Sequence, residues 1–141
     1  MFHEMRTPTM MRKFFLAFMN DKMKGTGVSG AISPFFIELS GDTGTTHKEL
    51  TERIGLNKSL TSRNIKFMMD EGYVENRSDG KEYSLFLTES GVEMRDDICR
   101  HLMDAHRYLF RDCTEEEMEI LKSVGKKIDI KVDEYLSGRS L

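Results

Sequence analysis

The chain has 141 residues, of which 38% are hydrophobic and 32% are charged, and its formal net charge is −3. This length and composition are those of one soluble globular domain, or of two small sub-domains with a shared core. No apolar run approaches the roughly 20 residues that a membrane-spanning helix needs, and the first residues lack a secretory signal pattern, so we expect a cytoplasmic protein. The charge is uneven, because residues 46–67 carry five basic and two acidic side chains.

The first predicted elements are two helices separated by a loop. Residues 10–23 have a helix-forming composition, and the three glycines of residues 25–30 predict a loop or hinge. Ser33 as N-cap with Pro34 at the first helical position predicts a short second helix, which residues 40–44 end. The predicted apolar face of the first helix consists of Phe14, Phe15, Phe18 and Met19. The second helix carries Phe35, Phe36, Ile37 and Leu39.

Two further helices follow, joined by a tight turn. Thr46 with Glu49 is a capping-box pattern that predicts the start of a third helix, and Gly55 predicts its end. After the turn, Asn57 is suited to cap a fourth helix that covers residues 58–71. Its predicted buried face consists of Thr61, Ile65 and Met68.

A β-hairpin is predicted next. Residues 73–76 and 82–88 are strand-like, with the turn sequence RSDG between them. Alternation along the second strand predicts Tyr83, Leu85 and Leu87 on one side. Two helices, a tight turn and a hairpin in this order predict a winged helix-turn-helix.

Two long amphipathic helices complete the predicted chain. The first runs from Glu89 to Arg111, and the second follows a capping box of Thr114 with Glu117 and runs to about Leu136. The apolar stripes are Met94, Ile98, Leu102, Ala105 and Leu109 in the first, and Met118, Leu121, Val124, Ile128, Val132 and Tyr135 in the second. These stripes exceed what a small domain covers, so we expect a homodimer.

The chain offers little to a cofactor or a catalytic reaction. Cys99 and Cys113 are both expected on one helix, about 21 Å apart at about 1.5 Å per residue, which is too far for a disulfide. His101 and His106 are five residues apart and point in different directions, which disfavours a metal site. A lone helical cysteine is usually a small apolar filler, which disfavours a redox site. No catalytic motif is present, so we predict no cofactor, no metal and no enzymatic activity.

Three segments resemble the MarR family of transcriptional regulators. "IGLNKSLTSRNIKFMMDEGYVE" resembles the family's turn, recognition helix and exit, "SDGK" resembles the wing tip, and "LTESG" resembles the start of its dimerisation helix. The resemblance covers nearly the whole chain. It implies a mainly α (α+β winged helix) fold, with a winged helix-turn-helix DNA-binding domain at residues 31–88 and a helical dimerisation region at residues 1–30 and 89–141.

The chain departs from the family pattern at the wing. Asn76 precedes Arg77 where the family usually has an arginine directly after the exit, and the wing is a few residues shorter. One arginine of the family's wing tip is missing, and Lys81 stands for the other.

The resemblance implies a transcriptional regulator, by family habit a repressor, that binds a pseudo-palindromic operator as a homodimer. Arg63 can offer a bidentate fork to guanine, Ser59 and Ser62 can reach bases or phosphate, and Lys58 and Lys66 suit phosphate oxygens. The alternative for these side chains is a helix face that is only solvated.

Two more groups are candidate DNA contacts. Arg77 and Lys81 on the hairpin could lie along the minor groove, or belong to a short solvated turn. Thr46 and His47 begin the third helix, where backbone N–H groups suit a phosphate, although a simple N-cap explains them as well.

A third group of candidates concerns an effector. Phe14, Phe18, Phe35 and Phe36 could line a pocket for a small aromatic effector, which the family commonly binds, or could be core. A rival function is a winged-helix protein-interaction or sensor module that does not bind DNA, which the acidic net charge and the shortened wing favour.

Overall fold

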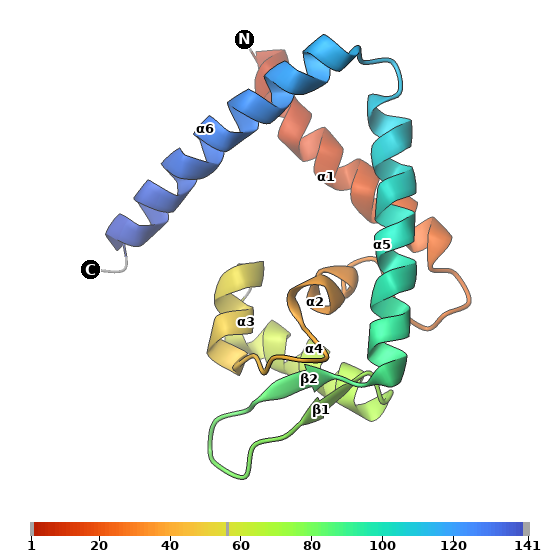
Figure 1. The fold of residues 1–141 in the computed structure, drawn as a ribbon, viewed down its shortest axis with the longest axis vertical. Helices are drawn as coiled ribbons and strands as arrows, with labels where there is room; N and C mark the ends of the chain where they lie inside the picture. Colours follow the sequence, from red (N-terminus) through yellow and green to blue (C-terminus); the bar gives the residue numbers. More distant parts are fainter. Residues whose placement is uncertain (1, 56, 140–141) are drawn as a thin grey trace. The chain divides into compact units, whose positions relative to one another are not determined.

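The computed structural model describes residues 2–55 and 57–139, with side chains from Arg6 onward. The elements in chain order are α1 Phe2–Lys22, α2 Ser33–Glu38, α3 His47–Ile54, α4 Lys58–Asp70, β1 Val74–Asn76, β2 Leu85–Leu87, α5 Glu89–Phe110 and α6 Glu115–Arg139 (Figure 1). The chain forms two compact units, one ending at His106 and one beginning at Arg107. The mainly α fold with one small sheet confirms the predicted class.

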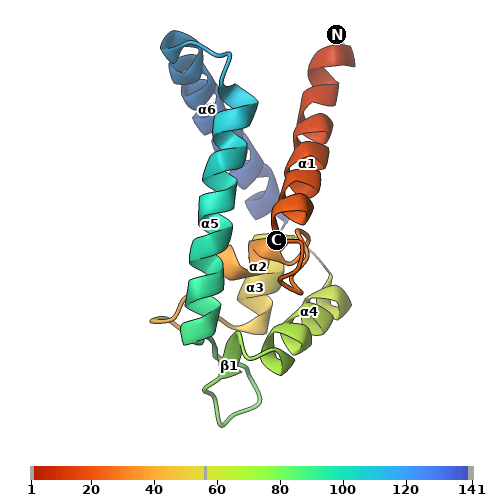
Figure 2. The same ribbon diagram turned by 90° about the vertical axis from the view of Figure 1, so that its right-hand side faces the viewer.

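The first unit has one hydrophobic core, to which α1, α2, α3, α4, both strands and α5 contribute. Figure 2 shows α2, α3, α4 and β1 gathered near the C-terminal end of α1 and the N-terminal end of α5. The buried apolar side chains are Met19, Met23, Val28, Phe35, Phe36, Leu39, Leu50, Ile65, Met68, Val74, Leu85, Leu87 and Ile98. Burying this set stabilises the unit by about 1.5–3 kcal/mol for each large side chain.

The sheet is a two-stranded antiparallel hairpin in which Val74 pairs with Leu87 and Asn76 pairs with Leu85. Thr45 adds an isolated bridge, because its backbone exchanges two hydrogen bonds with Leu85, at 3.1 and 2.9 Å. Leu85 and Leu87 are buried, as predicted. Tyr83 was predicted on their side, but it lies outside the strand and is 41% exposed, so the prediction is wrong there.

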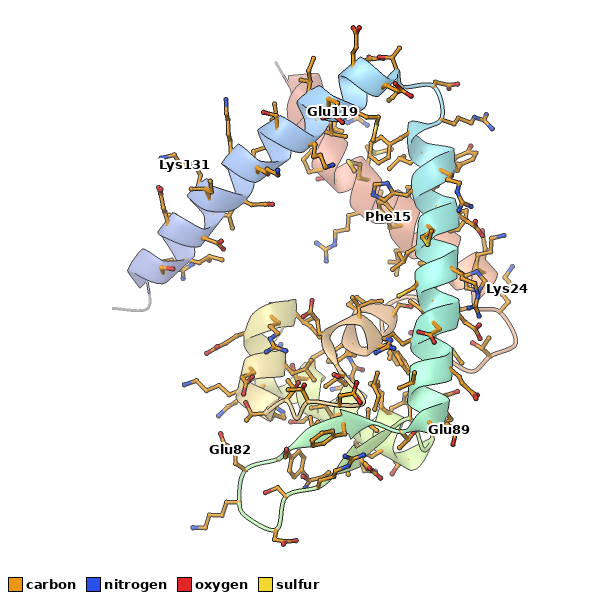
Figure 3. All side chains as sticks on the ribbon, viewed as in Figure 1. Phe15, Lys24, Glu82, Glu89, Glu119 and Lys131 are labelled. Carbon is orange, nitrogen blue, oxygen red and sulfur yellow. The ribbon has the colours of Figure 1, made fainter. Side chains whose placement is uncertain are left out.

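The hairpin loop closes through a side chain. The Oδ1 atom of Asn76 accepts hydrogen bonds from the backbone N–H groups of Ser78 and Ser84, both at 3.0 Å. The carbonyl of Ser84 in turn accepts from the backbone N–H of Arg77 at 2.9 Å. This capture of Ser84 explains why the regular strand starts only at Leu85. Figure 3 shows Glu82 on the same loop.

Two predictions for the N-terminal third are wrong in detail. α1 starts at Phe2 and not at Met10. Pro8 lies inside this helix and removes one backbone N–H, but the helix is continuous through it. Ile32 and not Ser33 occupies the N-cap of α2, and it forms no side-chain cap bond. Ser33 is buried inside the helix, because a turn closed by the Ile32 N–H and the Ser29 carbonyl has already begun.

The helix-turn-helix caps agree with the sequence. The Oγ1 atom of Thr46 accepts from the Glu49 N–H at 3.0 Å, and Gly55 adopts φ +76°, the left-handed conformation that suits glycine. The Oδ1 atom of Asn57 accepts from the Leu60 N–H at 2.8 Å. Both ends of α3 and the start of α4 are therefore set by short-range chemistry.

The start of α5 is fixed to the end of α4. The hydroxyls of Thr88 and Ser90 both donate to the Gly72 carbonyl, at 2.6 and 2.9 Å. Gly91 is required here, because a Cβ atom at this position would lie 2.1 Å from the carbonyl oxygen of Tyr73. The "LTESG" segment thus joins α5 to the helix-turn-helix by hydrogen bonds and a close backbone approach.

The second unit begins in the last turn of α5 and contains α6. Thr114 and Glu117 form the predicted capping box, since each backbone N–H donates to the other side chain, at 3.0 and 3.1 Å. The Thr114 backbone N–H, and then its side chain, hold the pKa of Glu117 below its ordinary value of 4.5. Cys113 lies after the end of α5, so the prediction that it shares a helix with Cys99 is wrong.

α6 continues to Arg139, beyond the predicted Leu136, and none of its described residues is buried. Figure 3 shows the charged side chains of Glu119 and Lys131 projecting from it. Its exposed large apolar side chains are Ile120, Leu121, Val124, Ile128, Ile130, Val132, Tyr135 and Leu136. None of the helices in the described part of the chain is long and apolar enough to cross a membrane.

Candidate nucleic-acid interface

α4 has two distinct faces. Thr61, Ile65 and Met68 are buried and hold the helix on the core. Five further side chains, all of them polar and exposed, lie at neighbouring positions on the other side of the helix. The exposed set consists of the predicted residues Lys58, Ser59, Ser62, Arg63 and Lys66. The structure therefore brings together on one helix face all five predicted recognition-helix residues.

The basic side chains of this face are available to a ligand. Arg63 is exposed, and no described residue forms an ion pair or hydrogen bond with it. Lys66 lies 3.6 Å from a carboxylate oxygen of Asp70, with side chains 80% and 64% exposed. An ion pair at that exposure contributes little, so a phosphate can replace Asp70 as the partner of Lys66.

His47 connects α3 to the exposed face of α4. Its Nε2 atom lies 2.8 Å from the Oγ atom of Ser62, and its Nδ1 atom lies 3.3 Å from the Oγ1 atom of Thr51. The sequence predicted phosphate binding or a simple N-cap for the helix start at His47, and phosphate binding by His47 stays a prediction. The structure gives its ring two intramolecular partners, and no sequence pattern pointed to Ser62 as one of them.

The side chain of Thr46 makes its hydrogen bonds within α3. Its hydroxyl accepts from the Glu49 N–H and donates to a carboxylate oxygen of Glu49 at 3.1 Å. Glu49 also pairs with Arg53 at 3.2 Å. The geometry is that of the simple N-cap, the alternative that the sequence left open, and phosphate binding by Thr46 stays a prediction.

On the hairpin, Arg77 has two partners of its own. Its Nε atom donates to Glu75 at 2.6 Å, and its guanidinium carbon lies 4.1 Å from the ring centroid of Phe86. This stacking holds the side chain along the strand. Lys81 is exposed in the loop. Contact of either side chain with DNA stays a prediction.

The four phenylalanines of the predicted effector site divide into two pairs. Phe35 and Phe36 are 0% exposed, and Phe36 makes an edge-to-face contact with Tyr73 at 5.2 Å between centroids. Phe14 and Phe18 are only partly buried and lie 5.5 Å apart on α1. The first pair is core, while the second remains accessible at its edges.

The described cysteines and histidines do not form a cluster that could bind a metal ion. Cys99 is partly buried and Cys113 is exposed, and both are free. Across residues 2–55 and 57–139, no three His, Cys, Asp or Glu side chains are grouped as a metal ion would require. His106 instead lies near an aromatic ring of α1, since its ring centroid is 6.2 Å from that of Phe15.

The fold and the helix-turn-helix segment are similar to those of known proteins. A family model described as winged helix-turn-helix DNA-binding matches residues 37–75, which hold α3, the turn, α4 and β1. A MarR transcriptional regulator from Methanosarcina mazei Go1 is 22% identical, with a TM-score of 0.81 over 91% of this chain and 88% of that one. The chain has the winged helix-turn-helix fold of the MarR regulators. A search of curated protein sequences finds no match.

Two more structures share the MarR fold with this chain. A MarR family transcriptional regulator from Listeria monocytogenes, solved in complex with 26mer DNA, is 20% identical, with a TM-score of 0.79 over 94% of this chain and 91% of that one. A structure of MarR itself is 17% identical, with a TM-score of 0.83 over 92% and 90%. The likeness covers nearly the whole chain, so the long helices belong to the shared fold together with the winged helix-turn-helix.

Proposed function

We propose that this protein is a DNA-binding transcriptional regulator, a repressor, that binds a pseudo-palindromic operator as a homodimer. The observation that carries the proposal is the exposed face of α4, where serine hydroxyls, a free guanidinium and two ammonium groups stand beside one another on a helix held rigidly from behind. An α-helix fits the major groove, and these are the groups that read base edges and neutralise phosphates. The match of residues 37–75 to a winged helix-turn-helix DNA-binding model supports it.

The residues divide by role. Arg63 makes a bidentate contact with a guanine, Ser59 and Ser62 contact bases, and Lys58 and Lys66 contact phosphates. Arg77 and Lys81 follow the neighbouring minor groove. In this division, residues 31–88 form the DNA-binding domain, and residues 1–30 and 89–141 form the dimerisation region. A protein with this function works where the DNA is, in the cytoplasm.

Homodimerisation is supported by α6. Eight of its large apolar side chains are exposed, and none of its described residues is buried. An apolar face of that extent on one helix is stabilised when a second subunit covers it. Two recognition helices related by a two-fold axis then enter successive major grooves, which is the geometry that a pseudo-palindrome requires.

The experiment is selection of bound sequences from a random duplex pool, followed by titration of the selected site and a scrambled duplex. The proposal expects one recurring inverted repeat and binding at least 1,000-fold tighter than to the scrambled duplex, about the lower end for specific DNA-binding proteins. Recovery of no common sequence, with equal affinity for both duplexes, would contradict it.

A second candidate function is a protein-interaction or sensor module that does not bind DNA. The net charge of −3 and the pairing of Arg77 with Glu75 favour it, because both reduce attraction to phosphate. A gel shift against random duplex DNA at low salt separates the two functions. Binding supports the regulator, while a complete absence of binding supports the interaction module.

An aromatic effector is the remaining part of the proposal. It binds against Phe14 and Phe18, whose rings are partly accessible, whereas Phe35 and Phe36 are fully buried in the core. A thermal-shift screen of small aromatic compounds tests this. The expected result is a stabilising compound that releases DNA and whose effect Phe18→Leu weakens, and a screen in which no compound does both would contradict it.

A further inference from the structure

We propose that His47 makes Ser62 a hydrogen-bond acceptor toward DNA, so that Ser62 reads the exocyclic amino group of an adenine or a cytosine. The inference rests on the proposed function and deepens it. His47 is a positioning residue in this account, because its ring acts on DNA through the Ser62 hydroxyl.

The first step is the proton of Thr51. Its hydroxyl donates to the backbone carbonyl of His47 at 2.8 Å, one turn earlier in α3. A hydroxyl has one proton, so Thr51 has only lone pairs left for other partners. The Nδ1 atom of His47, 3.3 Å from the same oxygen, must therefore be the donor in that contact.

The second step is the tautomer of His47. A neutral imidazole carries one N–H, and its other nitrogen is an acceptor. With the proton on Nδ1, the Nε2 atom accepts, and the group 2.8 Å from it is the Ser62 hydroxyl. Ser62 thus donates its only proton to His47. The chain of donors runs from Ser62 through His47 and Thr51 to a backbone carbonyl of α3.

The third step concerns the hydrogen-bonding capacity that the Ser62 hydroxyl has left for DNA. Ser62 is exposed on the recognition face, and its oxygen presents lone pairs but no proton. In the major groove, adenine N6 and cytosine N4 carry the amino donors, whereas guanine and thymine present acceptors at O6 and O4. Phosphate oxygens are acceptors too. A serine in this state favours an amino group and disfavours a keto oxygen or a phosphate, although a serine hydroxyl alone serves either kind of partner.

The tautomer is measured first, in the free protein. Long-range proton–nitrogen correlation in the imidazole ring of His47, recorded at about pH 8, reports which ring nitrogen carries the proton. The expected result is a protonated Nδ1 in the wild type and a shift toward protonated Nε2 in Thr51→Val. A wild-type ring protonated on Nε2 would overturn the inference, with or without DNA.

The base contact is measured next, on the site selected from the random pool. Single exocyclic amino groups are removed by replacing adenine with purine and cytosine with 2-pyrimidinone. At one position the wild type should lose roughly three- to tenfold in affinity, the size of one neutral hydrogen bond, and Ser62→Ala should lose nothing further. Thr51→Val and His47→Ala should show less than about half of the wild-type penalty in free-energy terms, because Ser62 then keeps its proton part of the time.

Thr43→Val is the matched control, since it makes the same change at an exposed position in the loop before α3. It should keep the full wild-type penalty, and circular dichroism melting should show all variants folded. An unchanged penalty in both Thr51→Val and His47→Ala would overturn the inference and leave the proposed function intact. Failure of the wild type to bind any duplex would contradict the proposed function itself, while the tautomer measurement would still decide the state of Ser62.

Discussion

α4 and α6 differ in which side chains they bury and which they expose. α4 buries Thr61, Ile65 and Met68 against its own chain and exposes hydroxyls and cations. α6 buries none of its described residues, and it exposes apolar side chains such as Tyr135, at 68%. The first helix is packed within one chain and exposes polar groups to a ligand, whereas the second exposes the apolar surface that the proposed dimer would cover.

The difference shows why an apolar stripe alone does not identify a core helix. Both helices place apolar side chains at three- and four-residue spacing, yet only in α4 does the rest of the chain supply the partner. Stability and function are therefore separable in this molecule. Changes on the exposed face of α4 should alter binding with little effect on folding, while changes on α6 should alter assembly.

The largest effect is expected from charges on α6. Val124→Asp combined with Ile128→Asp places four carboxylates in the proposed dimer interface and removes four buried side chains. At about 1.5–3 kcal/mol for each, the dimer should lose roughly 6 kcal/mol or more, which is about four orders of magnitude in its dissociation constant. Sedimentation velocity at micromolar concentration should show a monomer.

The control for that pair introduces two aspartates at other positions of α6. Ser123→Asp with Lys127→Asp has the same four-residue spacing on a more polar side of the helix. This variant should remain a dimer. A wild-type protein that sediments as a stable monomer, or a control that dissociates as completely as the test pair, would contradict the assignment of the apolar face.

The next effect is expected in the core beneath α4. Met68 is 0% exposed, so Met68→Ala should lower the free energy of unfolding by about 2–5 kcal/mol. Lys66→Ala, two residues earlier on the exposed face, should change it by no more than about 0.5 kcal/mol. Urea denaturation of both variants measures the difference, and equal losses would show that α4 does not have the two faces described.

The smallest effect concerns pH at the start of α6. Because the capping box holds the pKa of Glu117 below 4.5 in the folded state, its carboxylate stabilises the folded state above the unfolded pKa. That contribution is lost as pH falls below 4.5 through the folded pKa. Glu117→Gln should therefore lower stability at about pH 7 and matter less at about pH 3, as measured by urea denaturation.

Glu116→Gln is the control for the capping box. It removes the same charge one residue earlier in α6, outside the hydrogen bonds that Thr114 makes with Glu117. Its effect on the difference between the two pH values should be smaller. A larger effect than that of Glu117→Gln would contradict the assignment of the pH dependence to the capping box.

The sequence predicted best where short-range chemistry decides the structure. The caps at Thr46 and Asn57, the left-handed Gly55 and the capping box at Thr114 each depend on residues within one turn, and all are present. Element order and fold class follow from them. The same reasoning failed at Ser33, because the turn that begins at Ser29 competes with the side-chain cap and no local rule ranks the two.

The sequence predicted which residues make up the candidate site, but not the contacts between their side chains. The helical period turns Arg63 away from Ile65, which suffices to predict the exposure of Arg63. The contact of His47 with Ser62 spans 15 residues and depends on how α3 crosses α4, which no periodicity encodes. The stacking of Arg77 on Phe86 likewise depends on the strand register.

The measurement that tests the central claim most directly is the titration of Arg63→Ala on the selected site and on scrambled duplexes, with a melting curve alongside. The predicted result is a loss of about 1–3 kcal/mol on the selected site with relaxed discrimination at one base pair, and a stability change of no more than about 0.5 kcal/mol. Lys66→Ala should instead weaken all duplexes alike and reduce the salt slope by about one. Unchanged affinity of Arg63→Ala for the selected site, or a loss matched by unfolding, would contradict the claim that the exposed face of α4 reads DNA.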